Sequence, residues 1–422
     1  MNAASPVKPK DGSSPVRGNE KHARAALVAC CGVHALHDGL TDLLYVLLPV
    51  LAQAFGLSYS QVGLVRAVNK GAMAALQLPA GLLSEKLGER KLLAFGTACA
   101  GISYIWLGAA PGFYSILIAL FFAGAGASFQ HPLSSSIISG AYPAEGRRIA
   151  LGTYNFAGDV GKVAVSGGTG MLLAAGIAWQ MPAIGLGILA GICAALIVIL
   201  LKDVRGPEPQ QRTDRTAGKR GKNWGIRNRK GFVALCLFEV IDGGTRSGFL
   251  TFVAFLMIER GIEQGWAVIS VPMVAVGGMA GKIACGYLAE RLGVIRTLVT
   301  TEVATGAGIL LTLVLPPFAA YLLLPLIGVA LNGTSSVLYG TVGDLVDPKR
   351  MSRAFGLFYT LGSACGVVAP LAYGALADKI GILPTVAVVG AVVLTALPLC
   401  IVLRQAVSCV KPAESRQDNR AH

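Results

Sequence analysis

Stretches of about 20 or more mostly apolar residues follow one another along this chain, and they constrain its fold more than any other feature. A helix of that length crosses the roughly 30 Å hydrocarbon core of a bilayer. Of the 422 residues, 54% are hydrophobic and only 14% are charged, whereas soluble domains carry about a quarter charged residues. The sequence therefore predicts an all-α membrane protein.

Twelve such stretches can be delimited, six in each half of the chain. Those of the first half lie at 26–53, 58–83, 91–110, 113–141, 148–176 and 179–201. Those of the second half lie at 231–257, 264–289, 295–317, 318–344, 353–376 and 381–403. We expect a cytoplasmic tail at 1–25, a six-helix bundle at 26–201, a cytoplasmic linker at 202–230, a second bundle at 231–403 and a cytoplasmic tail at 404–422.

Basic residues are distributed unevenly over the predicted loops. The first, third and fifth connections contain no Lys or Arg, whereas the second and fourth contain Lys86, Arg90, Lys91, Arg147 and Arg148. Because cytoplasmic loops are rich in Lys and Arg, both termini and the linker are predicted to be cytoplasmic, with the chain in a bacterial inner membrane. The net charge of +14 then reflects topology and contact with anionic lipid, and no nucleic-acid partner is predicted.

The two halves carry matching segments, which indicates an internal duplication. Asp38-Gly39 in the first predicted helix matches Asp242-Gly243 in the seventh. A second match follows the second helix of each half, where Gly81, Glu85 and Gly88 correspond to Gly286, Glu290 and Gly293. In transporters built from such parallel repeats, the solute site lies near the membrane midplane where the halves meet.

The segment after the second helix reads Gly81-x-Leu83-Ser84-Glu85-Lys86-x-Gly88-x-Arg90-Lys91. It resembles the loop signature of the major facilitator superfamily, with Glu85 in place of the usual Asp. The resemblance implies the major facilitator fold, with twelve transmembrane helices in two pseudo-symmetric six-helix bundles around one solute path. It also implies that Gly81, Glu85, Gly88 and Arg90, together with Gly286, Glu290 and Gly293, form conformational loops, and Gly81 and Gly88 are expected to permit close backbone packing.

Three further motifs resemble the branch of this superfamily that contains fosmidomycin resistance proteins. They are His34-x-x-His37-Asp38, Phe129-Gln130-His131-Pro132-x-Ser134-Ser135 and Gly158-Asp159-Val160-Gly161. The resemblance implies drug efflux by proton antiport. The chain departs from the branch at Leu133, where an acid is usual, and has Val165-Ser166 where antiporters often carry Gly-Pro, so drug specificity and antiport direction stay open.

Ionisable side chains occur inside the predicted spans, where each costs about 2.5–3.5 kcal/mol on insertion scales. Such residues face a water-filled cavity or one another. The candidates for a solute and proton pathway are His34, His37, Asp38, Asp42, Arg66, Lys70, His131, Asp159, Lys162, Asp242 and Arg246, with Glu239 and Lys282 as weaker candidates. The cations among them favour a small anionic solute, such as a phosphonate or carboxylate. Buried carboxyl groups bind protons more readily than exposed ones, which makes protons a predicted partner too.

Several of these residues also have a purely structural interpretation. Asp242 and Arg246 can form a static ion pair, and Asp38 and Asp242 can be caps or hinges beside glycines. His131 can bond the carbonyl groups freed by Pro132, and Lys162 can pair with Asp159. The sequence leaves these alternatives open.

The sequence thus predicts a secondary active transporter that exports a small anionic or amphipathic compound in exchange for protons. Proton-coupled uptake of an anionic metabolite is the alternative in the same class, and a membrane-embedded enzyme or sensor is the alternative in another. The sequence shows no nucleophile elbow, metal-ligand spacing or phosphate-binding loop, so no enzymatic activity, cofactor or metal is predicted. A monomer is predicted, because one chain contains a complete path.

Overall fold

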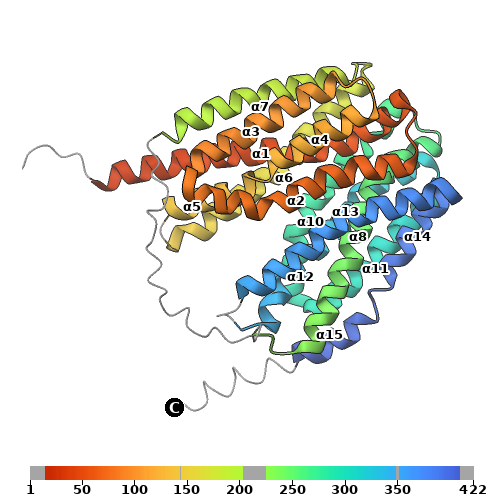
Figure 1. The fold of residues 1–422 in the computed structure, drawn as a ribbon. Helices are drawn as coiled ribbons and strands as arrows, with labels where there is room; N and C mark the ends of the chain where they lie inside the picture. The colour runs from red at the N-terminus through yellow and green to blue at the C-terminus, as the bar shows by residue number, and fades with distance from the viewer. Residues whose placement is uncertain (1–14, 143, 203–224, 348–350, 409–422) are drawn as a thin grey trace, which may run out of the picture.

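The computed structural model describes residues 15–142, 144–202, 225–347 and 351–408, and helices make up almost all of them (Figure 1). Residues 1–14 and 409–422 of the predicted tails and 203–224 of the predicted linker lie outside the described residues. The fifteen helices of the described part group into the twelve predicted spans, because three predicted spans are each divided into two helices. The prediction of an all-α fold is confirmed.

The first half of the chain contains seven helices, and the first of them is longer than its predicted span. α1 starts at Pro15, inside the segment predicted as a tail. The helices are α1 (Pro15–Phe55), α2 (Tyr59–Leu87), α3 (Glu89–Gly108), α4 (Phe113–Ala127), α5 (Gln130–Ala141), α6 (Ala144–Ala174) and α7 (Gln180–Leu200).

The second half contains eight helices. The last of them continues to Ser408, beyond the predicted end at residue 403. The helices are α8 (Arg229–Glu259), α9 (Gln264–Ala267), α10 (Ser270–Leu292), α11 (Val294–Val314), α12 (Pro317–Leu345), α13 (Met351–Ile380), α14 (Ile382–Leu394) and α15 (Leu399–Ser408).

Prolines explain where the three divided spans are interrupted. A proline has no N–H group, and its ring clashes with the carbonyl group four residues earlier in a helix. The interruptions occupy residues 128–129, 268–269 and 395–398. The prolines that follow or end them are Pro132, Pro272 and Pro398. The residues four positions earlier are Ser128, Val268 and Leu394. Each lies in an interruption or directly before it, so the helix is interrupted where the proline ring would clash.

The turn between the second and third spans has the same glycine conformation in both halves. Gly88 joins α2 to α3 with φ 88°, and Gly293 joins α10 to α11 with φ 87°. A side chain is strained at such positive φ values, so glycine is required at both turns. The shared conformation agrees with the duplication seen in the sequence.

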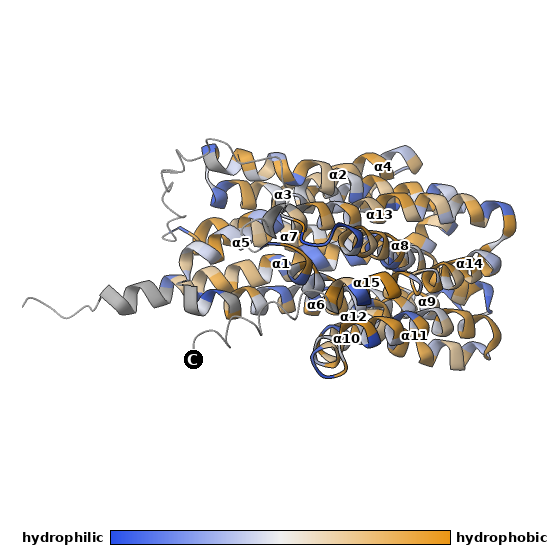
Figure 2. Ribbon diagram, turned by 90° about the horizontal axis from the view of Figure 1, so that it is seen from below, coloured by the Kyte–Doolittle hydropathy of each residue, from blue (hydrophilic) through white to orange (hydrophobic). Residues whose placement is uncertain are grey.

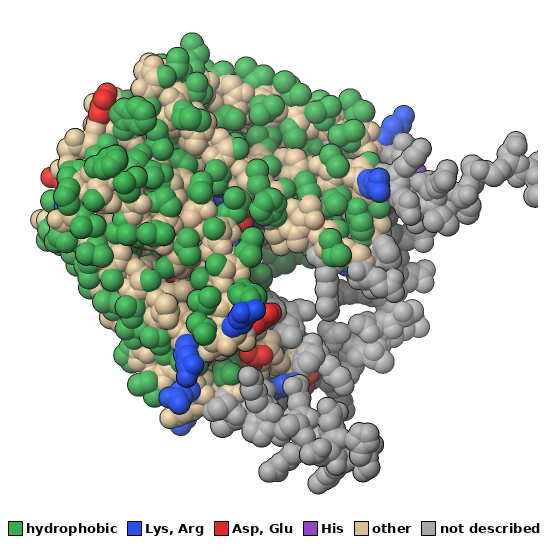
Figure 3. All heavy atoms as spheres, turned by 180° about the vertical axis from the view of Figure 1, so that it is seen from behind, with side chains coloured by type: hydrophobic (Ala, Val, Ile, Leu, Met, Phe, Trp, Pro, Cys, Tyr) green, Lys and Arg blue, Asp and Glu red, His purple; other side chains and the backbone are tan. Residues whose placement is uncertain are grey.

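The apolar core is continuous at one end of the molecule and divided at the other. A single cluster of buried side chains includes residues from 43–51 of α1 and from 249–257 of α8, so the two halves pack together there. Toward the other ends of α1 and α8 the core separates into one cluster in each half. The helices of the two halves diverge toward the termini (Figure 1), and the surface is hollowed between them on that side (Figure 3).

The helices are rich in apolar residues (Figure 2), and apolar side chains cover much of the surface seen in Figure 3. Large hydrophobic side chains are exposed on many helices, including Phe95, Ile188 and Phe318. Nine helices or helix pairs of the described part are long and apolar enough to cross a membrane. The predicted spans outside this set are α2, α6 and α8, whose interior positions carry Arg66, Lys70, Asp159, Lys162, Glu239, Asp242 and Arg246.

Candidate functional site

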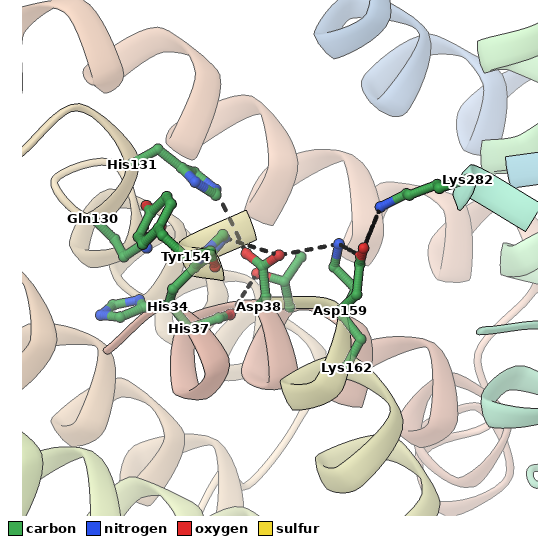
Figure 4. Close-up of polar contacts among 10 residues, drawn as sticks. His34, His37, Asp38, Gln130, His131, Tyr154, Asp159, Lys162 and Lys282 are labelled. Atoms are coloured by element: carbon green, nitrogen blue, oxygen red, sulfur yellow. Dashed lines mark hydrogen bonds and ion pairs between the residues drawn. The ribbon is translucent and has the colours of Figure 1, made fainter. Parts of the chain in front are cut away.

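Asp38 of α1 lies at the centre of a charged cluster (Figure 4). Its carboxylate oxygens lie 3.0 Å from Lys162 Nζ, 3.3 Å from His34 Nε2 and 3.6 Å from His131 Nε2. Asp38 is only 8% exposed. Because a buried charge is tolerated when it is paired, Lys162 and the two imidazoles explain how this acid is accommodated. The structure therefore brings four of the predicted pathway residues together.

A close crossing of α1 and α6 creates this cluster. A Cβ atom added at Gly161 would lie 2.0 Å from the backbone oxygen of Ala35, and one added at Gly158 would meet His34 and Asp38. Only glycine permits this approach. The glycines around Asp159 in the sequence thus bring Lys162 within reach of Asp38.

His34 is held in one orientation by the backbone of α6. Its Nδ1 atom lies 2.7 Å from the carbonyl oxygen of Tyr154, and its ring stacks on the Tyr154 ring at a centroid distance of 4.0 Å. Because a carbonyl oxygen only accepts, Nδ1 carries a proton. A neutral His34 then turns the lone pair of Nε2 toward Asp38. The His34–Asp38 contact becomes attractive when the pair holds one further proton, on either partner.

The cluster continues from the first half of the chain into the second. Lys162 Nζ lies 3.1 Å from Asp159 Oδ1, and Lys282 Nζ of α10 lies 2.7 Å from both carboxylate oxygens of Asp159. Asp38, Lys162, Asp159 and Lys282 therefore form a chain of alternating charge across the interface between the halves (Figure 4). The Lys282 side chain is 37% exposed, so water reaches the end of this chain.

Two cations of α2 lie beside the cluster. The Arg66 guanidinium lies 4.0 Å from the centre of the Tyr45 ring, and its Nη1 donates a hydrogen bond to the carbonyl of Thr41 at 3.3 Å. Arg66 Nε is buried and has no hydrogen-bond partner among the described residues. Asp42, one turn after Asp38, lies within Coulombic range of Arg66 and Lys162.

Lys70, one turn after Arg66, is half-buried at the interface between the halves. Its aliphatic stem lies against Gly366 of α13, where an added Cβ atom would be 3.1 Å from Lys70 Cγ. Within the described part of the chain, its ammonium group has neither a hydrogen bond nor an ion pair. Lys70 is thus a cation that the described residues leave unpaired.

Asp242 and Arg246 of α8 form the ion pair that their spacing predicted. Arg246 Nη2 lies 3.5 Å from Asp242 Oδ2, and it lies 3.9 Å from Oε1 of Glu239. Both acids are fully buried, whereas the Arg246 side chain is 22% exposed. One guanidinium group therefore faces two carboxyl groups.

His37 is the pathway candidate that the structure places elsewhere. Its Nε2 atom lies 3.0 Å from Thr97 Oγ1 of α3, and the Thr97 hydroxyl donates to the carbonyl of Leu93 at 2.8 Å. His37 Nε2 is therefore the donor in its bond to Thr97. This contact holds α1 to α3 and turns the ring away from the partners of Asp38.

The loop motif is organised differently from the expectation. A Cβ atom added at Gly81, Gly88 or Gly286 would have no atom of the described residues within 4 Å, so the close packing expected at Gly81 and Gly88 is not found. Arg90 Nη1 donates to the carbonyl groups of Leu201 and Lys202, at 3.4 and 3.0 Å, and so caps the end of α7. The Glu85 side chain lies outside the described part, and Glu290 is exposed.

A metal ion is one possible occupant of the Asp38 cluster, because His34, Asp38 and His131 each offer one ligand atom within 4.8 Å of the others. Two imidazoles and a carboxylate suit divalent transition metals. However, the Lys162 ammonium lies 3.0 Å from the same carboxylate and adds positive charge. The donor set is therefore better explained as an ion-pair and hydrogen-bond network than as a metal centre.

Sequence reasoning gave too little weight to two charged residues. Lys282 was a weak candidate, although it joins the two halves. Glu302 of α11 was not selected, although it is fully buried and both of its carboxylate oxygens have no hydrogen-bond partner in the described part. An acid inside the apolar 295–317 stretch was the signal that could have identified it.

Comparisons with known proteins agree with this architecture. The family model of the Major Facilitator Superfamily matches residues 30–370. A solved bacterial homologue of the human lysosomal transporter Spinster, in an inward-facing and unoccupied conformation, superposes with a TM-score of 0.75 at 15% identity, over 94% of this chain and 99% of that chain.

Three curated relatives span most of this chain. An uncharacterised major facilitator transporter of Bacillus subtilis is 26% identical over 91% of this chain and 93% of its own. The probable sulfoacetate transporter of Cupriavidus necator is 24% identical over 79% and 82%. The fosmidomycin resistance protein of Escherichia coli is 25% identical over 83% and 85%, which confirms the resemblance drawn from the histidine and glycine motifs.

The fold and the polar interface between two helical halves define a multi-pass membrane transporter rather than an enzyme. The chain belongs to the major facilitator superfamily.

Proposed function

We propose that this protein is a proton-coupled secondary transporter of a small organic anion. The observation that carries the proposal is the unpaired Lys70 beside Arg66, at the interface between the halves. Asp38 and Asp42 lie within Coulombic range of Lys70, but none of the described residues forms an ion pair with it. Such a half-buried cation is a binding group for a solute with a negative charge. The anion would complete an interface that already contains Lys162 and Lys282.

The unsatisfied donors of α2 support the same solute class. A buried donor without a partner costs about 1–3 kcal/mol. Arg66 Nε–H is such a donor among the described residues. Lys70 lies one turn later on the same helix and is half-buried. A carboxylate, sulfonate or phosphonate oxygen would satisfy them, and a guanidinium group binds such groups with good geometry.

Proton coupling is proposed from the acids of the pathway. The His34–Asp38 pair can hold one additional proton, because Nδ1 of His34 is committed to the Tyr154 carbonyl and its Nε2 faces Asp38. Asp242 is buried with a single nearby cation. Gain and loss of protons at such acids would couple solute movement to the proton gradient.

Export is the first direction that we propose, because the chain resembles a protein whose name records drug resistance. Uptake is the second candidate, favoured by the relative described as a probable sulfoacetate transporter. A strain that lacks the protein separates the two. Export predicts that it retains more of the anion, and uptake predicts that it accumulates less.

The topology is part of the proposal. The loop charges support cytoplasmic termini, bundles at 26–201 and 231–403 joined by the 202–230 linker, and residence in a bacterial inner membrane. The hollow on the side of the termini would then open to the cytoplasm. One chain contains both bundles, so a monomer is the proposed working unit.

The test is anion binding to purified full-length protein, read as thermal stabilisation by sulfoacetate, fosmidomycin and inorganic sulfate in turn. A ligand at about 100 times its Kd stabilises a folded protein by about 2.7 kcal/mol. We expect at least one organic anion to stabilise the wild type and Lys379→Gln, an exposed control, but not Lys70→Gln. Equal stabilisation of Lys70→Gln would contradict the proposed anion site.

A further inference from the structure

The second half of the chain contains a group of three buried acids, defined here as the α8–α11 acid group: Glu239 and Asp242 of α8 and Glu302 of α11. All three are 0% exposed. All six of their carboxylate oxygens are buried without a hydrogen-bond partner in the described part of the chain. The Thr334 side chain of α12 approaches Glu302, but its hydroxyl group donates to the carbonyl group of Ala330 at 3.1 Å. Buried carboxyl groups without a hydrogen bond are rare in proteins.

The acids face one another across a shared packing junction. α12 and α14 both pack against α8 and α11, and Glu302 lies within Coulombic range of Asp242 there. Glu239 and Asp242 lie three positions apart on α8, and both approach Arg246. The three acids therefore belong to one electrostatic unit.

The positive charge available to this unit is insufficient for three ionised acids. Among the described groups that interact electrostatically with the three acids, Arg246 is the only cation. The other titratable groups that face it are neutral phenols and thiols, contributed by α8, α12, α13 and α15: Cys236, Tyr339, Tyr359, Cys365 and Cys400. Lys282 of α10 interacts with Arg246 but is paired with Asp159.

Hydroxyl groups without partners lie on the same helix faces. Thr245, one turn after Asp242, and Thr305, one turn after Glu302, are buried, and neither Oγ1 atom has a hydrogen-bond partner among the described residues. These hydroxyl groups are available to donate to, or accept from, a carboxyl group that changes its protonation state.

An ionised Glu302 would lack both a hydrogen bond and a counter-ion within ion-pair distance in the described part of the chain. Burial of an isolated charge costs far more than burial of the neutral acid, so such a group binds a proton instead. With one guanidinium for three carboxyl groups, the acid group is electrically balanced when it holds two protons. Glu302 is the member with no cation within ion-pair distance in the described part, so it is the first to hold one.

We propose that the α8–α11 acid group is a proton-binding site, with Glu302 carrying a proton at neutral pH while Glu239 and Asp242 share the second. The inference deepens the proposed function, because it adds a second proton-binding site to the His34–Asp38 pair. The α8–α11 acid group differs from Asp38 in its charge balance, because the Asp38 carboxylate has its own cation, Lys162, at 3.0 Å.

The test is infrared spectroscopy of the solute-free, full-length protein, which detects the carbonyl stretch of protonated carboxyl groups directly. In sodium-free buffer at neutral pH, we expect the wild type to show this absorption and Glu302→Gln to lose one component of it. Glu263→Gln, at an exposed loop position, is the matched control and should keep every component. Glu302→Asp provides a second variant, for which the component should shift in frequency rather than disappear.

Two results would overturn the inference. A Glu302→Gln spectrum identical to that of the wild type would mean that Glu302 is ionised. Loss of the wild-type absorption when sodium chloride replaces choline chloride would assign the site to a sodium ion instead. Because the measurement uses no solute, the proton site can be confirmed even if reconstituted protein moves no protons with an anion, which would refute only the proposed coupling.

Discussion

Lys282 and Asp159 join the two halves of the protein at the charged interface, because the Lys282 ammonium lies 2.7 Å from each carboxylate oxygen of Asp159. Asp159 also binds Lys162, which in turn binds Asp38. The four charges of the interface therefore form one connected network, and removal of a charge at one end alters the electrostatic energy of the charges at the other end. A transporter that opens alternately on two sides must rearrange this contact.

The Lys282–Asp159 pair should contribute a measurable coupling energy. We expect Lys282→Met and Asp159→Asn to be non-additive by about 1 kcal/mol in a double-mutant cycle of thermal unfolding. The value is modest because Lys282 is 37% exposed, and water screens the pair. Additive effects of the two substitutions would show that the contact contributes nothing to stability.

Lys162 should be necessary mainly because Asp38 is charged. In Lys162→Met the buried Asp38 loses its closest cation, and we expect a loss of about 3 kcal/mol in the free energy of unfolding. The double variant Lys162→Met/Asp38→Asn removes the uncompensated charge and should regain most of that stability. Denaturation of the wild type and the two variants in detergent tests this. A double variant no more stable than Lys162→Met would refute the explanation.

Asp378 of α13 caps the first turn of α2 in the opposite half of the chain. Its carboxylate accepts hydrogen bonds from the backbone N–H groups of Tyr59 at 2.8 Å and Ser60 at 3.0 Å, and from the Ser60 hydroxyl. A carboxylate at a helix N-terminus also interacts favourably with the helix dipole. This contact closes the end of the molecule away from the termini.

Removal of that cap should loosen the closed end. In Asp378→Ala we expect faster hydrogen exchange at the start of α2, because two amides lose their acceptor. Lys379→Gln changes the next residue, which is exposed, and serves as the control. Hydrogen-exchange mass spectrometry measures the exchange rate in the peptide around residues 58–62. Equal protection of that peptide in both variants would show that Asp378 does not hold this end closed.

The α1–α6 crossing can be tested with one substitution at two glycines of the same helix. Gly161→Ala places a Cβ atom 2.0 Å from the Ala35 oxygen, so we expect a loss of about 1–3 kcal/mol in stability and separation of Lys162 from Asp38. Gly168→Ala has no atom of the described residues within 4 Å and should be neutral or stabilising by up to about 1 kcal/mol. Similar stabilities for the two variants, measured by thermal unfolding, would contradict the close crossing.

The spans could be predicted from the sequence because apolar length alone determines them. The positions of the three helix interruptions could not be predicted from proline alone. Pro49 and Pro325 lie inside continuous helices, whereas Pro272 follows an interruption and Pro398 ends one. The effect of a proline depends on whether neighbouring helices satisfy the freed carbonyl groups.

The candidate site was predicted in its residue types and in its pairs within one helix, Asp159–Lys162 and Asp242–Arg246, but not in its contacts between helices. The cost of burying charge identified Asp38, Asp159 and Lys162. Their partners depend on helix rotation and on close crossings between segments distant in the sequence. His37 and Asp38 are neighbours in the chain, yet His37 contacts α3 and Asp38 contacts α6.

We propose that an anion and protons move through one charged path between the halves. The most direct test is proton movement in proteoliposomes that contain a pH-sensitive dye, after addition of the organic anion that binds the purified protein. We predict solute-dependent proton movement with the wild type and Lys379→Gln, and none with Asp38→Asn. Solute movement without protons, or undiminished coupling in Asp38→Asn, would contradict the account.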